Sequence, residues 1–159
     1  MCIRDSIGTI DEEGFLQITD RKKNIIVTSG GKNIAPFQIE NVLSKSRYID
    51  QIVVIGDRRN FLTAAVVPAR EAVELWAKAS GINYSSWDEL RNKAEVYQLI
   101  DHDIQHLQEE FARYEKVKKF FIPPESFTIE GGELTPSMKI KRKVVEEKYK
   151  KEIDALYSA

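Results

Sequence analysis

The pattern of hydrophobic and polar positions in the first forty residues is that of short β-strands. Apolar or β-branched stretches separated by turn-like segments predict three strands, at residues 8–10, 15–19 and 24–28. Residues 11–14 read Asp-Glu-Glu-Gly, and Gly14 can adopt the positive φ angle that a hairpin turn needs. The N-terminal part therefore predicts a β-hairpin followed by one more strand.

The middle of the chain predicts helices and strands in alternation. Two apolar strands, 51–56 and 62–67, are joined by a polar turn, which favours antiparallel pairing. A helix is expected before them, over 36–46, because proline suits its first position. Another is expected after them, over 71–80.

The second half of the chain predicts helices around one short strand. Ser86 and Glu89 have the spacing of a capping box, which begins a helix. A long helix follows, whose apolar positions recur at steps of three and four and indicate a core-facing stripe: Val96, Leu99, Ile100, Ile104, Leu107, Phe111, Tyr114 and Val117. The remaining elements are a strand at 120–122, an extended segment at 134–140 and a terminal helix at 141–156.

This order of elements predicts an α/β (α+β) domain, a small sheet covered by helices with a β-hairpin at its N-terminal end. A length of 159 residues fits one domain. The net charge of -1, from 24 basic and 25 acidic residues, argues against a protein that binds nucleic acid. No apolar run approaches the roughly 18 residues that span a bilayer, so we expect no membrane anchor in this chain.

Cysteine and histidine are too scarce to suggest a disulfide or a metal site. Cys2 is the single cysteine, and residues 1–6 lack an apolar signal region, so a reducing, cytoplasmic location fits best. His102 and His106 are spaced to place two ligands on one helix face, but no third ligand is evident. A charged helix is the simpler interpretation, and we expect this chain to bind no metal.

The first segment with unusual chemistry is residues 20–34, DRKKNIIVTSGGKNI. Four basic residues surround Gly30 and Gly31 there: Arg21, Lys22, Lys23 and Lys32. Glycine lets a ligand approach the backbone closely, so this pattern fits an anion site. On composition alone, a glycine-containing hairpin between solvated charges is the favoured interpretation. The spacing of a phosphate-binding P-loop is absent.

The second segment is residues 134–143, LTPSMKIKRK. Four of its residues within five positions are basic: Lys139, Lys141, Arg142 and Lys143. The positive end of a helix dipole disfavours each exposed cation by about 0.3–1 kcal/mol, so local helix stability does not explain them. Two explanations stay open: a solvated basic face offset by Glu146 and Glu147, or an extended approach that presents Lys139 to an anionic partner.

Together the two segments resemble the C-terminal lid domain of the AMP-forming acyl-CoA synthetases, in the adenylate-forming superfamily. Residues 7–34, with Pro36 and Glu40 after them, carry the first match, and residues 134–142 before a charged helix carry the second. The long insertion around 87–119 resembles the long-chain fatty acid–CoA ligase branch. The resemblance implies an enzyme that forms acyl-adenylate from ATP and a fatty acid, then acyl-CoA and AMP.

The resemblance also implies roles for individual residues. Lys139 matches the catalytic lysine of adenylate formation. Arg21 matches the arginine that contacts the ribose of the adenylate, and Lys23 matches the hinge about which the lid rotates.

A second set of residues matches the surface that receives coenzyme A. Gly30 and Gly31 match the glycine pair along the path of the pantetheine arm, and Lys32 matches a basic residue near the coenzyme A phosphates. The implied substrates are ATP, with AMP as product, and coenzyme A. Mg²⁺ is implied for the full enzyme but not for this chain.

The resemblance covers residues 7–159, and the chain departs from the family before that point. Ser6 stands where the family has an aspartate that grips the ribose, so we expect residues 1–6 to be a leader foreign to the family. We expect 7–22 to end the linker and hairpin of the N-terminal domain, and 23–159 to form the lid. The ATP-binding elements and the acyl tunnel would lie in a missing N-terminal domain, the expected partner, so this chain should be a fragment that is inactive alone.

Two other functions remain open. The chain is alternatively the lid of another adenylate-forming acid ligase, since the acid-binding pocket would lie outside it. It is alternatively a stand-alone regulatory domain that binds a nucleotide or coenzyme A. Peripheral association of the intact enzyme with a membrane also stays open, because its implied substrate is a lipid.

Overall fold

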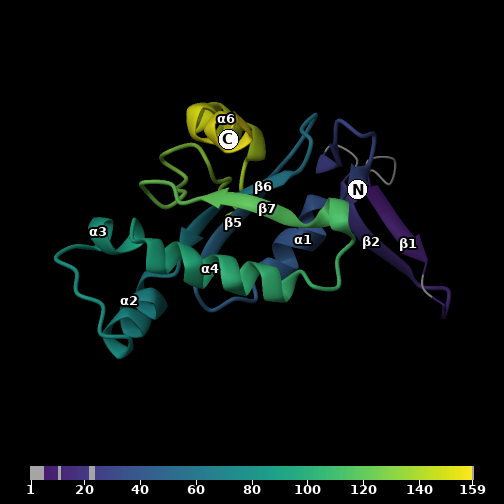
Figure 1. The fold of residues 1–159 in the computed structure, drawn as a ribbon. Helices are drawn as coiled ribbons and strands as arrows, with labels where there is room; N and C mark the ends of the chain where they lie inside the picture. Colours follow the sequence, from purple (N-terminus) through teal and green to yellow (C-terminus); the bar gives the residue numbers. More distant parts are fainter. Residues whose placement is uncertain (1–5, 11, 22–23, 159) are drawn as a thin grey trace.

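The computed structural model describes residues 6–10, 12–21 and 24–158, with only the backbone described for 6–9 and 17–21 (Figure 1). The elements in chain order are β1 (Ser6–Ile10), β2 (Leu16–Arg21), β3 (Ile26–Val27), β4 (Asn33–Ile34), α1 (Pro36–Leu43), β5 (Ile49–Ile55), β6 (Leu62–Pro68), α2 (Arg70–Ala79), α3 (Trp87–Arg91), α4 (Ala94–Leu107), a 3₁₀ turn η3 (Arg113–Glu115), β7 (Val117–Phe121), α5 (Arg142–Lys148) and α6 (Lys150–Ser158). The predicted fold class, a small sheet covered by helices, is confirmed.

The central sheet has three strands in the order β5-β6-β7. β5 and β6 pair antiparallel with Val54 opposite Ala64, as the sequence predicts, and β7 adds to the other side of β6 in parallel. β6 is buried along its whole length, as a central strand must be when both faces of its sheet are covered. β5 is left as an edge strand.

The two faces of the sheet form two separate hydrophobic cores. Ile52 and Val54 of β5 pack in the core that includes residues of α1 and α4, whereas Val53 and Ile55 pack in the core that includes residues of α5 and α6. This alternation follows from the period of two along a strand. In Figure 1, α6 lies on one side of the sheet, and α1 and α4 lie on the other.

Two small hairpins precede this sheet. β1 and β2 pair antiparallel, and Gly14 between them has φ +85°, which confirms the predicted turn. The predicted strand at 24–28 is shorter than expected, since β3 consists of Ile26 and Val27 and pairs with β4. Pro36 begins α1, as predicted.

The predicted long helix is wrong at its C-terminal end. α4 ends at Leu107, and Val117 begins β7 instead of ending the helix. The fully buried Gln108 side chain explains the change, because it donates to the carbonyl of Val117 (2.9 Å) and accepts from its amide (2.8 Å). Tyr114, expected in the core stripe, is 46% exposed.

The predicted terminal helix is two helices, α5 and α6, which meet at Tyr149. The buried ring of Tyr149 lies near the rings of Phe121 and Phe127, with centroids 5.7 and 6.4 Å away. We attribute the break to this packing, because the backbone at Tyr149 leaves helical geometry (φ -109°, ψ 27°) where its side chain enters the core.

The segment 134–140 is not extended throughout, contrary to the prediction. Leu134 and Ile140 form an isolated antiparallel bridge, and the five residues between them turn back on themselves. Met138 has φ +62°, a left-handed conformation that ends an extended approach. Lys139 is therefore presented from a tight turn.

The predicted capping box before α3 forms only in part. The Ser86 hydroxyl accepts from the amide of Glu89 (3.2 Å), as expected of an N-cap. The Glu89 carboxylate, however, accepts from the amide and hydroxyl of Ser85 instead of from Ser86. These hydrogen bonds lower the pKa of Glu89 to about 2, the hydroxyl of Ser85 contributing most.

Candidate functional site

The Gly30–Gly31 turn joins β3 to β4 and is exposed. Gly31 has φ +76°, and its amide donates to the carbonyl of Thr28 (2.9 Å). The Thr28 amide donates to the carbonyl of Lys32, and the Thr28 hydroxyl accepts from the amide of Lys32. A Cβ at Gly30 would meet only the Thr28 hydroxyl at 3.9 Å, and one at Gly31 would meet nothing within 4 Å. The fold therefore leaves the outer surface of this turn open to a ligand.

A second turn, between β5 and β6, holds the Gly30–Gly31 turn in place. Ser29 donates from its amide to the carbonyl of Arg59 (3.0 Å) and from its hydroxyl to the side chain of Asn60 (2.7 Å). Val27 accepts from the amide of Arg58 (2.8 Å) and donates to the Asp57 carboxylate (3.2 Å). Asp57 to Asn60 appear in the sequence as a polar turn alone, with no signal of this contact.

Lys32 lies at the edge of the Gly30–Gly31 turn. Its ammonium is 5.4 Å from the ring centroid of Tyr114, within the range of a cation–π contact. The insertion around 87–119 thus reaches the glycine turn through Tyr114. The sequence pattern placed Tyr114 in the core stripe and so missed this position.

The remaining residues of the first segment are only partly visible. Arg21 ends β2, and its side chain is not among those described. Lys23 lies outside the described residues. The proposed ribose contact and hinge therefore stay predictions.

Lys139 stands on a turn whose backbone is held by Thr135. The Thr135 amide donates to the carbonyl of Lys139 (2.8 Å), and the Thr135 hydroxyl accepts from the amide of Lys139 (3.0 Å). The Thr135 amide and hydroxyl are thus both engaged by one residue, which leaves the Lys139 side chain exposed on a fixed backbone. Thr135 was not identified from the sequence, although Thr-Pro-Ser is a turn signal.

An ion pair between a buried carboxylate and a half-exposed lysine supports the base of this turn. Glu133 is 1% exposed and is bonded by the ammonium of Lys148 in α5. Burial favours the neutral acid, but the Lys148 ammonium and backbone amides outweigh it, so the pKa of Glu133 is lowered. The same contact raises the pKa of Lys148. Gly131 is required here, because a Cβ would come within 2.2 Å of the Glu133 carboxylate.

The basic cluster at the start of α5 is not a simple solvated face. Arg142, the first residue of that helix, forms an ion pair with Glu40 of α1 at 2.6 Å instead of with Glu146 or Glu147. Both side chains are largely buried, at 19% and 18% exposed. The sequence contains no signal of this pairing, because 102 positions separate the two residues.

The structure does not bring the two segments into one site. Among the described residues, no hydrogen bond or ion pair joins the turn of Gly30 and Gly31 to the turn of Thr135 to Lys139. Each turn has its own bonds to the rest of the domain. The chain therefore presents two separate candidate surfaces, one with open backbone and one with an exposed lysine.

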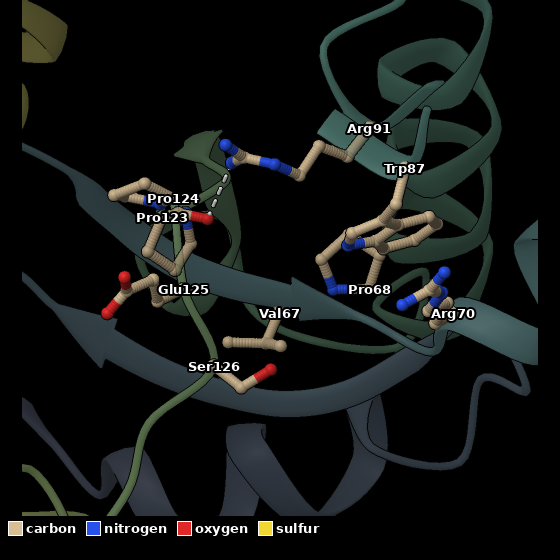
Figure 2. A pocket seen from close by; sticks show the side chains of 9 residues that line it. All are labelled: Val67, Pro68, Arg70, Trp87, Arg91, Pro123, Pro124, Glu125 and Ser126. Carbon is tan, nitrogen blue, oxygen red and sulfur yellow. Dashed lines mark hydrogen bonds between the residues drawn. The ribbon is translucent and has the colours of Figure 1, made fainter. Parts of the chain in front are cut away.

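A third feature is a hollow of about 300 Å³ between β6, α3 and the segment after β7 (Figure 2). Arg91 lies at its rim and donates to the Asp88 carboxylate and to the carbonyl of Pro123, both at 2.9 Å. Arg70 is paired with Glu74 at 3.0 Å. None of the residues with an expected role lines this hollow.

The described part of the chain has neither a metal-binding cluster nor a helix that could span a membrane. Within 6–10, 12–21 and 24–158, no group of three or more His, Cys, Asp or Glu side chains is arranged to hold a metal ion. A ring nitrogen of His106 lies 3.4 Å from the Glu109 carboxylate, and both side chains are exposed. No helix in the same residues has the length and apolar character needed to cross a membrane.

The fold and the two surfaces define a C-terminal domain of an adenylate-forming enzyme. The chain belongs to the family of AMP-binding enzyme C-terminal domains, which matches residues 23–159. This finding confirms the resemblance drawn from residues 20–34 and 134–142.

Particular relatives narrow the comparison. The chain is 42% identical over 156 residues to the long-chain-fatty-acid–CoA ligase FadD15 of Mycobacterium tuberculosis, a match that covers 96% of this chain and 26% of FadD15. It is 39% identical over 156 residues to long-chain-fatty-acid–CoA ligase 5 of Mus musculus, covering 96% of this chain and 23% of the relative.

A solved structure gives the same picture. The adenylation domain of a carboxylic acid reductase from Segniliparus rugosus, in complex with AMP and a co-purified carboxylic acid, has a TM-score of 0.76 and 27% identity. That match covers 97% of this chain and 23% of the solved chain. This chain thus spans about a quarter of the length of the relatives it matches.

Proposed function

We propose that this chain is the lid of a long-chain fatty acid–CoA ligase, which forms acyl-adenylate from ATP and a fatty acid and then acyl-CoA and AMP. The observation that carries the proposal is the 42% identity to FadD15 over 96% of the chain. The substrates are a fatty acid, ATP and coenzyme A, and the remaining three quarters of the enzyme would supply the acid and ATP pockets. Mg²⁺ would be held there as well.

In the first step, the fatty carboxylate attacks the α-phosphate of ATP and pyrophosphate leaves. Two anions must approach each other, and the Lys139 ammonium offsets their repulsion by lying between them. Thr135 fixes the backbone of Lys139, so the ammonium group has fewer orientations to adopt before it reaches the reacting groups. Arg21 would contact the ribose of the nucleotide in the same pose.

In the second step, the thiol of coenzyme A displaces AMP from the acyl-adenylate. The lid would rotate about Lys23, withdraw Lys139 and bring the Gly30–Gly31 turn to the intermediate. The open outer surface of that turn suits a thin pantetheine arm, because no side chain projects from it. Lys32 would approach the coenzyme A phosphates, exchanging its contact with Tyr114 for a stronger one.

The proposal is tested by a chimera, full-length FadD15 in which this chain replaces the matching C-terminal quarter. We expect the chimera to form acyl-CoA, and Lys139→Ala to lower acyl-adenylate formation about 100-fold. Thioester formation from supplied acyl-adenylate should change less than about threefold, because the other surface serves that step. Lys143→Ala, an exposed lysine of the same segment, is the matched control and should leave both steps unchanged.

The result that would contradict the proposal is an equal loss in both half-reactions for Lys139→Ala.

A second candidate is a lid that serves acid activation without coenzyme A, and the similarity to the carboxylic acid reductase adenylation domain favours it. Acyl-adenylate formation by the chimera with no coenzyme A-dependent thioester would support that candidate.

A further inference from the structure

We infer that Arg142 and Glu40 are positioning residues that fix the Lys139 turn against the edge of β5 and so serve acyl-adenylate formation selectively. This inference rests on the proposed role of Lys139. Arg142 occupies the first position of α5, where the helix dipole disfavours a cation. A stabilising contact for this arginine must therefore come from another part of the domain.

The geometry is a closed ring of three hydrogen bonds around Val54, which we call the edge clamp. One oxygen of Glu40 accepts from the Val54 amide (2.8 Å) and from the Arg142 guanidinium (2.6 Å). A second nitrogen of Arg142 donates to the Val54 carbonyl (2.8 Å). Because β5 is an edge strand, these two side chains satisfy backbone groups that a further strand would otherwise pair.

The edge clamp is directly connected to the Lys139 turn. Arg142 follows Lys139 by three residues, and the intervening Lys141 donates its amide to the carbonyl of Glu133 at 2.6 Å. Ile140 pairs with Leu134 across the turn. The turn is therefore held at its base and tied through Arg142 to the sheet, so losing the clamp frees it to shift.

The Gly30–Gly31 turn does not depend on the clamp. Its bonds run to Asp57, Arg58, Arg59 and Asn60 of the β5–β6 turn. We expect those bonds to persist when Arg142 or Glu40 is changed, because neither residue takes part in them. A selective loss of the Lys139 step follows, and a displacement of about 1 Å at a reacting group can cost up to roughly 100-fold in rate.

The competing explanation is that Arg142 contacts a phosphate directly. A substitution of Glu40 distinguishes this explanation from the clamp. Glu40 is an anion and cannot bind a phosphate, yet it holds half of the clamp. Glu40→Met keeps the length of the side chain but removes the oxygen that accepts both bonds. If Arg142 acts through the clamp, Glu40→Met must cause the same selective loss. If Arg142 binds phosphate directly, Glu40→Met must spare or increase the rate.

The experiment uses the FadD15 chimera with Arg142→Gln, Glu40→Met and the double substitution. We expect each single variant to lower kcat for acyl-adenylate formation about tenfold, with KM for ATP within about twofold. Thioester formation from supplied acyl-adenylate should stay within about twofold. The double variant should be no slower than the slower single variant, because each single substitution already breaks the edge clamp.

Arg91→Gln is the matched control for lost stability. Like Arg142, Arg91 is mostly buried, at 11% exposed, and joins a carboxylate to a backbone carbonyl (Figure 2). We expect it to lower the melting temperature without a selective loss of acyl-adenylate formation. An equal selective loss in Arg91→Gln would overturn the inference.

Amide hydrogen exchange tests the clamp independently of activity. In Arg142→Gln and Glu40→Met, the amides of residues 138–141 should exchange faster, while those of residues 28–32 should not change. Unchanged exchange at 138–141, a loss shared by both half-reactions, or a loss in Arg142→Gln alone would overturn the inference. A chimera that forms no acyl-adenylate would overturn the proposed function. Amide hydrogen exchange at residues 138–141 of its variants would still show whether the clamp holds the Lys139 turn.

Discussion

At the scale of single residues, the two glycines of the β3–β4 turn serve different purposes. Gly31 has φ +76°, which an L side chain rarely adopts, whereas Gly30 has no positive φ and open space around it. The backbone therefore requires glycine at position 31. At position 30, the fold has room for a methyl group, so only a bound ligand would clash with it.

Substitution of the two glycines should separate stability from function. Gly31→Ala should lower the free energy of unfolding by about 1 kcal/mol, because of the left-handed backbone. Gly30→Ala should change it by less than about 0.5 kcal/mol, measured by urea unfolding of this chain. In the chimera, Gly30→Leu should raise KM for coenzyme A with little effect on acyl-adenylate formation, and an unchanged KM would contradict the proposed path.

Glu133 makes the stability of the domain depend on pH. Its pKa is lowered in the folded state, so its contribution is present at neutral pH and is lost as the pH falls through the ordinary carboxyl range. Lys148→Met should lower the free energy of unfolding by about 2 kcal/mol at pH 7, because it leaves a buried carboxylate without its cation.

The difference between wild type and Lys148→Met should shrink as the pH falls through the ordinary carboxyl range and below it, because the lowered pKa of Glu133 delays its protonation in the folded wild type. Urea unfolding at several pH values measures it. Lys150→Met, an exposed lysine in the next helix, is the control and should show no such dependence. A difference that is constant with pH would contradict the role of Glu133.

At the scale of elements, the end of α4 is decided by a side chain from just beyond the helix. Gln108 pairs with both backbone groups of Val117 at the start of β7, much as a neighbouring strand would. A buried amide that satisfies two buried groups is costly to remove, because both are left without partners.

Gln108→Ala should therefore lower the free energy of unfolding by about 2 kcal/mol or more. Gln98→Ala, an exposed glutamine within α4, is the control and should cost less than about 0.5 kcal/mol. Thermal or urea unfolding of both variants measures the difference. Equal costs would show that Gln108 does not anchor β7.

At the scale of the whole molecule, the sheet buries both faces and leaves the two candidate surfaces outside its cores. In the proposed function, the exposed Lys139 turn and the open glycine turn act only beside the part of the enzyme that would hold nucleotide and acid. We expect this chain alone to release no pyrophosphate from ATP in the presence of a long-chain fatty acid. Turnover above background by the purified chain would contradict that expectation.

The sequence by itself determined the fold class, the antiparallel pair of β5 and β6, and the family. Those features rest on local signals: a period of two along buried strands, turn residues, and two motifs in order. The role of Lys139 also comes from the sequence, as a prediction from the resemblance, and the structure adds that its backbone is fixed.

Only the tertiary structure decided where α4 ends, where the terminal helix breaks, and what Arg142 does. In each case a side chain meets a partner distant in sequence or in another element: Gln108 with Val117, Tyr149 with Phe121, Arg142 with Glu40. Helical periodicity continues through all three positions, so it contains no trace of these contacts. The free energy of each contact depends on burial in the folded domain, which a one-dimensional pattern does not record.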